Sequence, residues 1–392
     1  MQTYSDPAGG SPSAIGSQIR VDHYIKAALI EVAKERYFGA LADTTAMPKN
    51  MGKKIKRFLY VPLLDDANIN DQGLDAEGVA SVNGNLYGSS KDVGTIVGKL
   101  PVLSETGGRV NRVGFTRVEL EGSLEKYGFF EEYTQESLDF DTDAELEQHI
   151  NREMIFGANE ITEDLLQIDL LNAAGVIYFA GDATEDAEMS GVADAVTEVS
   201  YADLSRLSVE LDNNRAPKST KVISGSRMVD TRVIRGGRVM YIGSELTQTV
   251  EQMVDYFGNQ AFISVAHYAD AGTILNGEIG TVGQFRLVVV PEMMHFSGAG
   301  AVEGVNSGYR ATGGNYDVFP MLVVSDASFT TIGFQTSGNT VKFNIKHAKP
   351  GSPESYANDP YGETGFMSIK WYYGFMALRP ERIAILKTVA KM

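Results

Sequence analysis

About fifty weakly apolar residues separate two strand-like stretches, and this segment constrains the fold more than any other feature of the sequence. The first stretch covers residues 53–64 and the second covers residues 112–130. Between them, residues 65–103 are acidic, glycine-rich and poorly periodic, with a turn signal at Asn83-Gly84. Compact monomers rarely contain so long a connection without structure of its own. We expect the two strands to form a long hairpin arm that lies on another subunit, with a mobile surface loop as the alternative.

The clearest helical pattern in the sequence covers residues 142–173. Thr142 and Glu145 are spaced as a capping box at its start, and Gly157 inside it marks close packing or a bend. Apolar residues recur at spacings of three and four, namely Leu146, Ile150, Met154, Ala158, Ile161, Leu165 and Ile168. A helix of about thirty residues is roughly 45 Å long, which suggests a spine across an extended body.

The rest of the chain predicts a mixed α/β body. Ser200 and Asp203 are spaced to open a helix at 201–213. Ser244 is expected to cap another helix, with an apolar face of Leu246, Val250, Met253, Val254 and Phe257. Strands are expected at residues 238–243, 285–291, 319–324, 329–334, 341–347, 368–378 and 382–389. With a polar arm at 1–20 and a short helix at 22–37, the order is arm, long hairpin, spine helix, α/β body and a final strand pair, which favours one α+β unit with appendages.

The composition excludes several classes of protein. The formal net charge of the 392 residues is −17, so the surface repels phosphate backbones and anionic membranes, although an acidic wall could let DNA slide past it. The chain contains no cysteine, which excludes disulfides, thiolate metal sites and cysteine nucleophiles. The N-terminus lacks a secretory pattern, and no run of 18 apolar residues occurs. We therefore expect a soluble protein made in a cytoplasm that does not read nucleic-acid sequence.

The motif search predicts no catalytic residue, no cofactor and no metal. Three glycines approach a dinucleotide fingerprint, but the last spacing is one residue too long, namely Gly298, Gly300 and Gly304. Residues 139–145 begin like a calcium loop, yet Ala144 and Ile150 stand where the turn glycine and the bidentate glutamate belong. An acidic helix start is favoured there, with an adventitious surface cation as the alternative. No ligand pair forms among the histidines, which are His23, His149, His267, His295 and His347.

Two groups of residues are candidates for contacts between subunits. The one strong positive patch on this acidic chain consists of Lys53, Lys54, Lys56 and Arg57. Nucleic acid is one candidate partner for it, and an acidic neighbouring subunit is favoured because the rest of the chain supplies ample acid. The second group is aromatic and consists of Phe129, Phe130, Trp371, Tyr372 and Tyr373. For these residues, burial in the core of their own chain is favoured over a contact between subunits.

Several stretches resemble the major capsid proteins of tailed bacteriophages. The chain is similar to the family typified by coliphage N-four over most of its length, at residues 37–63, 125–141, 211–232, 237–246 and 279–298. The order of elements resembles the Hong Kong 97-type capsid fold, an α+β fold with an N-terminal arm, an extended loop, a peripheral domain with a long spine helix, and an axial α/β domain. The resemblance implies a structural subunit and no enzyme. Such subunits self-assemble into hexamers and pentamers of an icosahedral virion head around double-stranded DNA.

The resemblance also implies a role for each region of the chain. The expected divisions are an arm with a short helix at 1–52, the extended loop and its flanking strands at 53–135, the peripheral domain with the spine helix at 136–199, the main axial domain at 200–345 and a return to the peripheral domain at 346–392. Some relatives cross-link a loop lysine to a neighbour's asparagine, and Lys91 or Lys99 could be donors, although nothing marks an acceptor. The implied partners are further copies of the chain, with portal, scaffolding and decoration proteins, and no membrane.

Three other functions stay open from the sequence. An encapsulin-type nanocompartment shares the fold and encloses cargo protein. A tail or collar component of the virion would form rings or tubes. An enzyme with a dispersed site is the third, and the motif search argues against it.

Overall fold

The described part of the chain forms two compact units in a computed structural model of the protein. The described residues are 37–41, 43–50, 52–60, 117–140, 146–192, 196–224, 230–235, 237–268, 275–304, 308–334, 343–352 and 360–391. The smaller unit includes residues 130–156 and 347–367, and the larger unit includes most of the rest. The sequence predicted one unit with appendages, whereas the chain divides into two compact units. Three long elements nevertheless continue from one unit into the other, namely β3 (Arg117–Thr134), α3 (Leu146–Asn172) and β16 (Thr364–Ala377).

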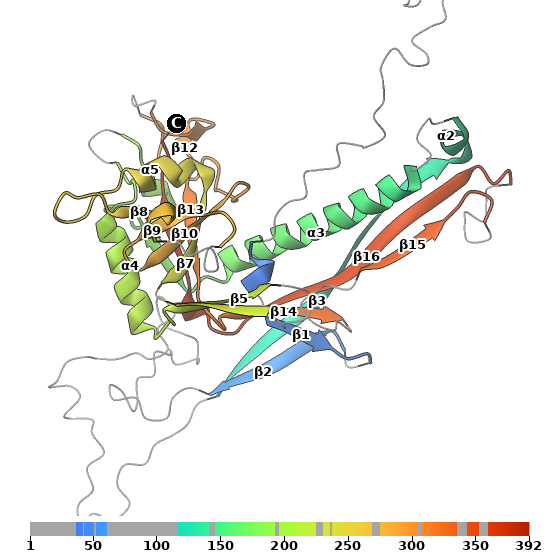
Figure 1. Ribbon diagram of the computed structural model, residues 1–392, viewed down its shortest axis with the longest axis horizontal. Coiled ribbons are helices and arrows are strands. Elements are labelled where there is room, and N and C mark those ends of the chain that lie inside the picture. The colour runs from blue at the N-terminus through green and yellow to red at the C-terminus, as the bar shows by residue number, and fades with distance from the viewer. Residues whose placement is uncertain are drawn as a thin grey trace, which may run out of the picture. The chain divides into compact units, whose positions relative to one another are not determined.

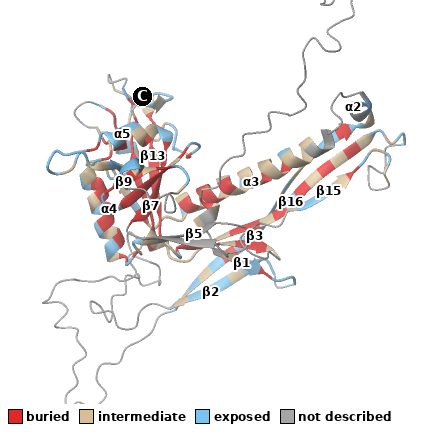
Figure 2. Ribbon diagram, in the orientation of Figure 1, coloured by how far each residue is buried: buried red, intermediate tan, exposed pale blue. Residues whose placement is uncertain are grey.

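A seven-stranded mixed sheet forms the core of the larger unit, in the order β4-β17-β13-β7-β10-β9-β8. Strands β7, β8, β9, β10 and β13 of this sheet are labelled in Figure 1. Its strands are β4 (Val176–Phe179), β7 (Arg238–Gly243), β8 (Phe262–Ser264), β9 (Glu278–Val282), β10 (Phe285–Val290), β13 (Phe319–Val324) and β17 (Ile383–Thr388). Every residue of β7, β13 and β17 is buried, as Figure 2 shows for β7 and β13. Continuous burial is expected for strands that are covered on both faces.

Helix α4 (Tyr201–Asn213) packs on this sheet through Leu204, Leu207 and Leu211, which belong to the same buried cluster as the strands. The predicted capping box is confirmed, because the Ser200 hydroxyl accepts from the Asp203 N–H and the Asp203 carboxylate accepts from the Ser200 N–H. This box satisfies two backbone donors that the first helical turn would otherwise leave unpaired.

The helix predicted after Ser244 is shorter than the sequence suggests. It consists of a 3-10 turn, η4 (Ser244–Leu246), followed by α5 (Thr247–Glu251), and Ser244 makes no side-chain capping bond. Val254 and Phe257 were expected on its apolar face, but both are exposed. The helix ends because the backbone N–H groups beyond it bond to the carboxylate of Asp255 and form a tight turn.

A second, six-stranded sheet has the order β1-β14-β16-β3-β2, with β15 also paired to β16. Its further strands are β1 (Asp43–Met47), β2 (Lys54–Tyr60), β14 (Phe329–Phe334) and β15 (Asn344–Ala348). β2 pairs antiparallel with β3, from Lys54 opposite Ser123 to Tyr60 opposite Arg117. The pairing of the two strands that flank the long segment is therefore confirmed, whereas residues 61–116 lie outside the described residues.

The predicted final strand pair was wrong, because β16 and β17 belong to different sheets. Burial largely alternates along β16, which is the pattern of a strand with one covered face, whereas β17 is buried throughout. The short 3-10 turn η5 (Pro380–Arg382) connects them. The continuous burial of β17 agrees with its position between β4 and β13 in the seven-stranded sheet.

The helix predicted at 142–173 is confirmed as α3, although its proposed cap at Thr142 lies outside the described residues. Its buried stripe agrees with the prediction at Met154 and Ala158 and differs further along. Ile161 and Ile168 were expected to be buried but are exposed. The residues buried instead are Glu163, Leu166, Gln167 and Leu170. A spacing of three and four fits more than one stripe of a long helix, and the packing partners select the stripe.

The smaller unit contains the ends of β3 and β16, the start of α3, and α2 (Gln135–Phe140). Tyr133 is buried and hydrogen-bonded to His347, with their rings 5.9 Å apart. The Gln135 N–H donates to the Glu363 carbonyl at 2.7 Å. These bonds fix the end of β3 against β15 and against the loop before β16. The short helix predicted at 22–37 lies almost wholly outside the described residues.

Candidate assembly surfaces

The basic cluster lies on β2, which is the terminal strand of the six-stranded sheet. All four of its predicted residues are exposed, namely Lys53, Lys54, Lys56 and Arg57. Lys54 pairs with Glu121, and Lys56 pairs with Glu119 and, at 3.7 Å, with Glu121. The Lys54 hydrogen bond lowers the pKa of Glu121, and the Glu119 hydrogen bond raises the pKa of Lys56.

These ion pairs follow from the antiparallel register, which brings alternate residues of β2 and β3 to one face. Phe58 lies on the same face as the two paired lysines and is exposed, with the Arg117 guanidinium 4.1 Å from its ring centroid. Arg57 points to the other face, 3.4 Å from the Thr45 hydroxyl. Two of the four cations thus have acidic partners in their own chain, and a contact with a neighbouring subunit stays a prediction.

The aromatic candidates differ from one another in burial. Trp371 and Tyr373 are buried, which confirms the core interpretation for them. Phe129 is half-buried with its ring 6.1 Å from that of Trp371. Phe130 is 59% exposed, so core burial was wrong for this residue; successive residues of a strand point to opposite faces. Phe130 stays a candidate for a contact between subunits. Lys91 and Lys99 lie outside the described residues.

Sequence reasoning missed a second exposed surface, the turn of residues 254–260, which we call the aromatic turn. Phe257 is 88% exposed and Tyr256 is 68% exposed. The pattern of Asp255 followed by Gly258 is a turn signal that could have located it. The helical spacing of Val254 and Phe257 outweighed that signal in the prediction.

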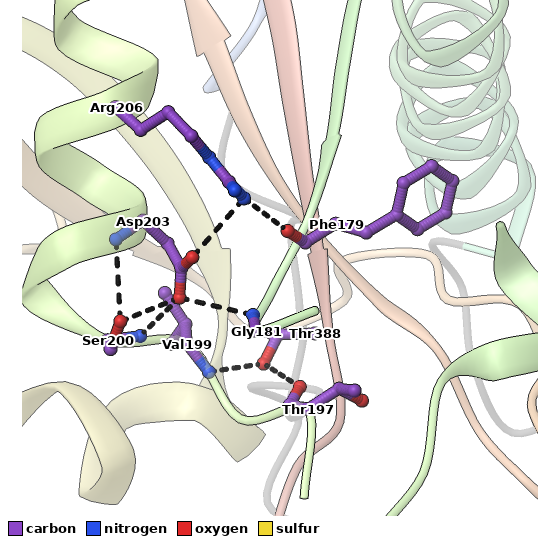
Figure 3. Close-up of polar contacts among 8 residues, drawn as sticks. All are labelled: Phe179, Gly181, Thr197, Val199, Ser200, Asp203, Arg206 and Thr388. Atoms are coloured by element: carbon purple, nitrogen blue, oxygen red, sulfur yellow. Dashed lines mark hydrogen bonds and ion pairs between the residues drawn. The ribbon is translucent and has the colours of Figure 1, made fainter. Parts of the chain in front are cut away.

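The polar cluster around Asp203 is structural (Figure 3). The Asp203 carboxylate accepts from the Ser200 hydroxyl at 2.7 Å and from the Gly181 N–H at 3.4 Å. Arg206 lies 3.3 Å from the same carboxylate and donates to the Phe179 carbonyl at 2.9 Å. Because the carboxylate accepts both from α4 with its cap and from the Gly181 N–H after β4, it fixes α4 against the end of β4.

The described ranges contain no group of three or more histidine, aspartate or glutamate side chains that could hold a metal ion. None of the helices that the structure describes is long and apolar enough to cross a membrane. The glycine-rich stretch around Gly298 and Gly300 opens no helix; the Gly298 N–H donates to Asp317 at 2.7 Å. Exposed apolar side chains that gather on a surface are a feature of proteins that bind other protein chains.

Comparison with known proteins identifies the family. The model of the phage capsid protein family matches residues 117–387. The chain is 61% identical over 390 residues to the major capsid protein of Pseudomonas phage KPP21, and the match covers 99% of this chain and 97% of that relative. The chain belongs to the phage capsid protein family.

Solved structures show the same fold at low sequence identity. The capsid of Ralstonia phage GP4 matches with a TM-score of 0.55 and 13% identity, over 98% of each chain. The capsid of cyanophage Pam1 matches with a TM-score of 0.51 and 13% identity, over 95% of this chain and 97% of that one. The predicted phage capsid fold with mixed α+β content is confirmed at this level. The predicted function, a structural subunit of the virion shell, is confirmed by the family, and the nanocompartment alternative is not favoured.

Proposed function

We propose that the chain self-assembles into hexamers and pentamers that close an icosahedral head around packaged double-stranded DNA. The observation that carries this proposal is the 61% identity to a relative named major capsid protein, which extends over 99% of the chain. Portal, scaffolding and decoration proteins are further proposed partners. The net charge of −17 supports a shell wall along which DNA can slide, because the negatively charged protein surface repels the negatively charged phosphates of DNA.

We assign the regions with one change from the division expected from the sequence. The antiparallel pairing of β2 and β3 supports residues 53–135 as the extended loop with its flanking strands. Helix α3 supports a spine in the peripheral domain at 136–199. The axial domain is proposed to comprise 200–345 together with β4 and β17, because both strands lie in the seven-stranded sheet. The return to the peripheral domain is then restricted to β15 and β16.

We also propose that the basic strand β2 contacts an acidic surface of a neighbouring subunit. Lys54 and Lys56 remain more than half exposed in their side chains although each is ion-paired. A terminal strand also presents backbone groups on the edge away from β3 that can pair with another chain. Exposed ion pairs contribute little to the stability of a single chain. Assembly is therefore the property that these lysines should affect most.

Light scattering and electron microscopy of the purified, untagged protein test the proposal. Closed polyhedral shells that contain DNA when isolated from cells are expected. Shells that contain only protein, open tubes, or a monomer under all conditions would contradict it. Replacing both Lys54 and Lys56 with alanine should raise the concentration required for assembly several-fold. Lys49→Ala, an exposed lysine in the turn before β2, is the matched control and should have no effect.

A further inference from the structure

The aromatic turn presents a large apolar side chain to solvent at its tip. Phe257 is 88% exposed, and Val254 of the same turn and Ile263 of β8 are exposed as well. Tyr256 packs edge-on against Tyr201 with ring centroids 5.2 Å apart, so one aromatic residue of the turn is held by its own chain and the next is not. A concentration of apolar surface of this kind marks a site that binds another protein.

Hydrogen bonds hold the aromatic turn in one conformation. Asp255 Oδ1 accepts from the N–H groups of Phe257 and Asn259, both at 2.8 Å. The Asp255 N–H donates to the Asn259 carbonyl at 2.8 Å, and Gly258 adopts a φ of 79°, which favours glycine. These backbone donors keep the pKa of Asp255 below its usual value. Because the turn is ordered before binding, little conformational entropy is lost when Phe257 is buried.

A groove of about 110 Å³ lies in the same unit, between α4 and the turn that joins β9 to β10. We call it the α4 groove; it is lined by Tyr201, Leu204, Ser205, Ser208, Val209, Asp212 and residues 282–285. A closed cavity of about 150 Å³ accommodates benzene in another protein. The α4 groove is smaller but open on one side, so a phenyl ring can enter it without being enclosed on every face. Val209 is exposed on its rim.

The α4 groove also contains an unused hydrogen-bonding group. Ser208 is 6% exposed, and its Oγ has no hydrogen-bond partner among the described residues. A buried hydroxyl without a partner costs free energy, so a backbone N–H or C=O that enters with an apolar side chain would be bound favourably. This requirement suits a turn of another chain better than a small apolar molecule.

We propose that Phe257 of one subunit docks in the α4 groove of a neighbouring copy. The occupant is assigned to a second copy because the chain belongs to a family of shell subunits and itself carries a rigid aromatic tip that fits the groove. Phe257 is too exposed to fill its own groove, although Tyr256 contacts the groove residue Tyr201. The turn and the groove adjoin through Tyr256 and Tyr201 but consist of different residues, so every copy offers both and the contact can repeat from copy to copy. This inference rests on the proposed self-assembly and names a contact within it.

A double-mutant cycle on the full chain tests the pairing. Phe257→Ala and the groove-filling Ser205→Trp should each raise the concentration required for assembly at least tenfold and leave the thermal midpoint of the unassembled subunit unchanged. The double variant should be no worse than the stronger single variant, because both changes remove one contact. Effects that multiply to a hundredfold, or a Phe257→Ala variant that assembles like the unaltered chain, would overturn the inference while the proposed function stands. Failure of the unaltered chain to assemble would overturn both.

Cross-linking supplies a second readout, since the chain contains no cysteine. Chains with Gln260→Cys are mixed with isotope-labelled chains that carry Ser205→Cys, assembled, and treated with a short bismaleimide. A mixed product of labelled and unlabelled chains is expected. Tyr361→Cys, at an 86% exposed aromatic residue of the other unit, replaces Gln260→Cys as the control and should give none. Equal yields from the two mixtures, or no product in assembled shells, would refute the docking.

Discussion

Replacing Glu163 should destabilise the larger unit more than replacing any other charged residue of α3. The side chain is 7% exposed, and its Oε1 accepts from the backbone N–H groups of Tyr37, Phe38 and Gly39 at 2.9, 2.6 and 3.1 Å. Phe38 is itself buried, with its ring 4.8 Å from that of Tyr241. One carboxylate oxygen therefore attaches the segment before β1 to the helix.

The magnitude follows from the donors that lose their acceptor. Glu163→Ala leaves three N–H groups without this partner at about 1–3 kcal/mol each, and some are expected to gain water, so we expect a loss of about 3–5 kcal/mol in the free energy of unfolding. Glu163→Gln keeps an acceptor oxygen without the charge, and charge-assisted bonds are roughly twice as strong as neutral ones, so about 1–2 kcal/mol should be lost. Glu153→Ala, an exposed residue of the same helix, should lie within about 0.5 kcal/mol of the unaltered chain.

Denaturant unfolding of the unassembled subunit measures these differences. The fluorescence of Trp371 is a suitable probe, because it is the chain's single tryptophan and lies buried in the same unit as Glu163. The midpoint should shift without a change in slope. A loss below about 1 kcal/mol for Glu163→Ala, or equal losses for the alanine and glutamine variants, would refute the assignment of the carboxylate as the essential acceptor.

Four further predictions concern β16, α3, α4 and η5. An alanine Cβ at Gly374 would lie 2.4 Å from a backbone oxygen of β3, so Gly374→Ala should cost at least about 2 kcal/mol in unfolding experiments. A Cβ at Gly157 in α3 would lie 3.7 Å from the nearest atom, Cζ of Phe129, which is an ordinary contact distance. Gly157→Ala should therefore raise the free energy of unfolding by up to about 1 kcal/mol, and a decrease would contradict this reasoning. Ser200→Ala should cost about 1 kcal/mol and Asp203→Ala about 2–3 kcal/mol, because the latter also releases donors outside the capping box; the reverse order would be evidence against it. Burial raises the pKa of Glu381 above 4.5, so its protonated form stabilises the fold below that pH, and this stability is lost as the pH rises through the raised pKa. Thermal melts of Glu381→Gln should therefore show a more stable protein than the unaltered chain at pH 7 and no difference near pH 4, whereas the opposite trend would refute the cause.

Local patterns in the sequence identified the elements whose partners are near in the chain. The capping box at Ser200 and Asp203 needs only three residues' spacing, and the continuous apolar runs at 238–243 and 319–324 need only burial to become strands. Because each feature depends on a few neighbouring residues, reading the chain was sufficient to find it.

The candidate surfaces were predictable only in part. The basic residues of β2 were found from their clustering, but their partners Glu119 and Glu121 depend on a strand register across more than fifty intervening residues. The aromatic turn was assigned to a helix because Val254 and Phe257 have helical spacing. The competing bonds of Asp255 to the backbone of its own turn decided otherwise.

The sequence by itself determined the helix α3, the cap of α4, the main strands and the resemblance to phage capsid proteins, since all of these are carried by spacing and residue type. Tertiary structure alone decided which stripe of α3 is buried, where Glu163 replaces Ile161 and Ile168. It also decided that β17 leaves its neighbour β16 to pair with β4 and β13. Both outcomes depend on contacts between segments that are distant in the sequence. The spacing of apolar residues along one element does not determine which of its faces packs against such a segment.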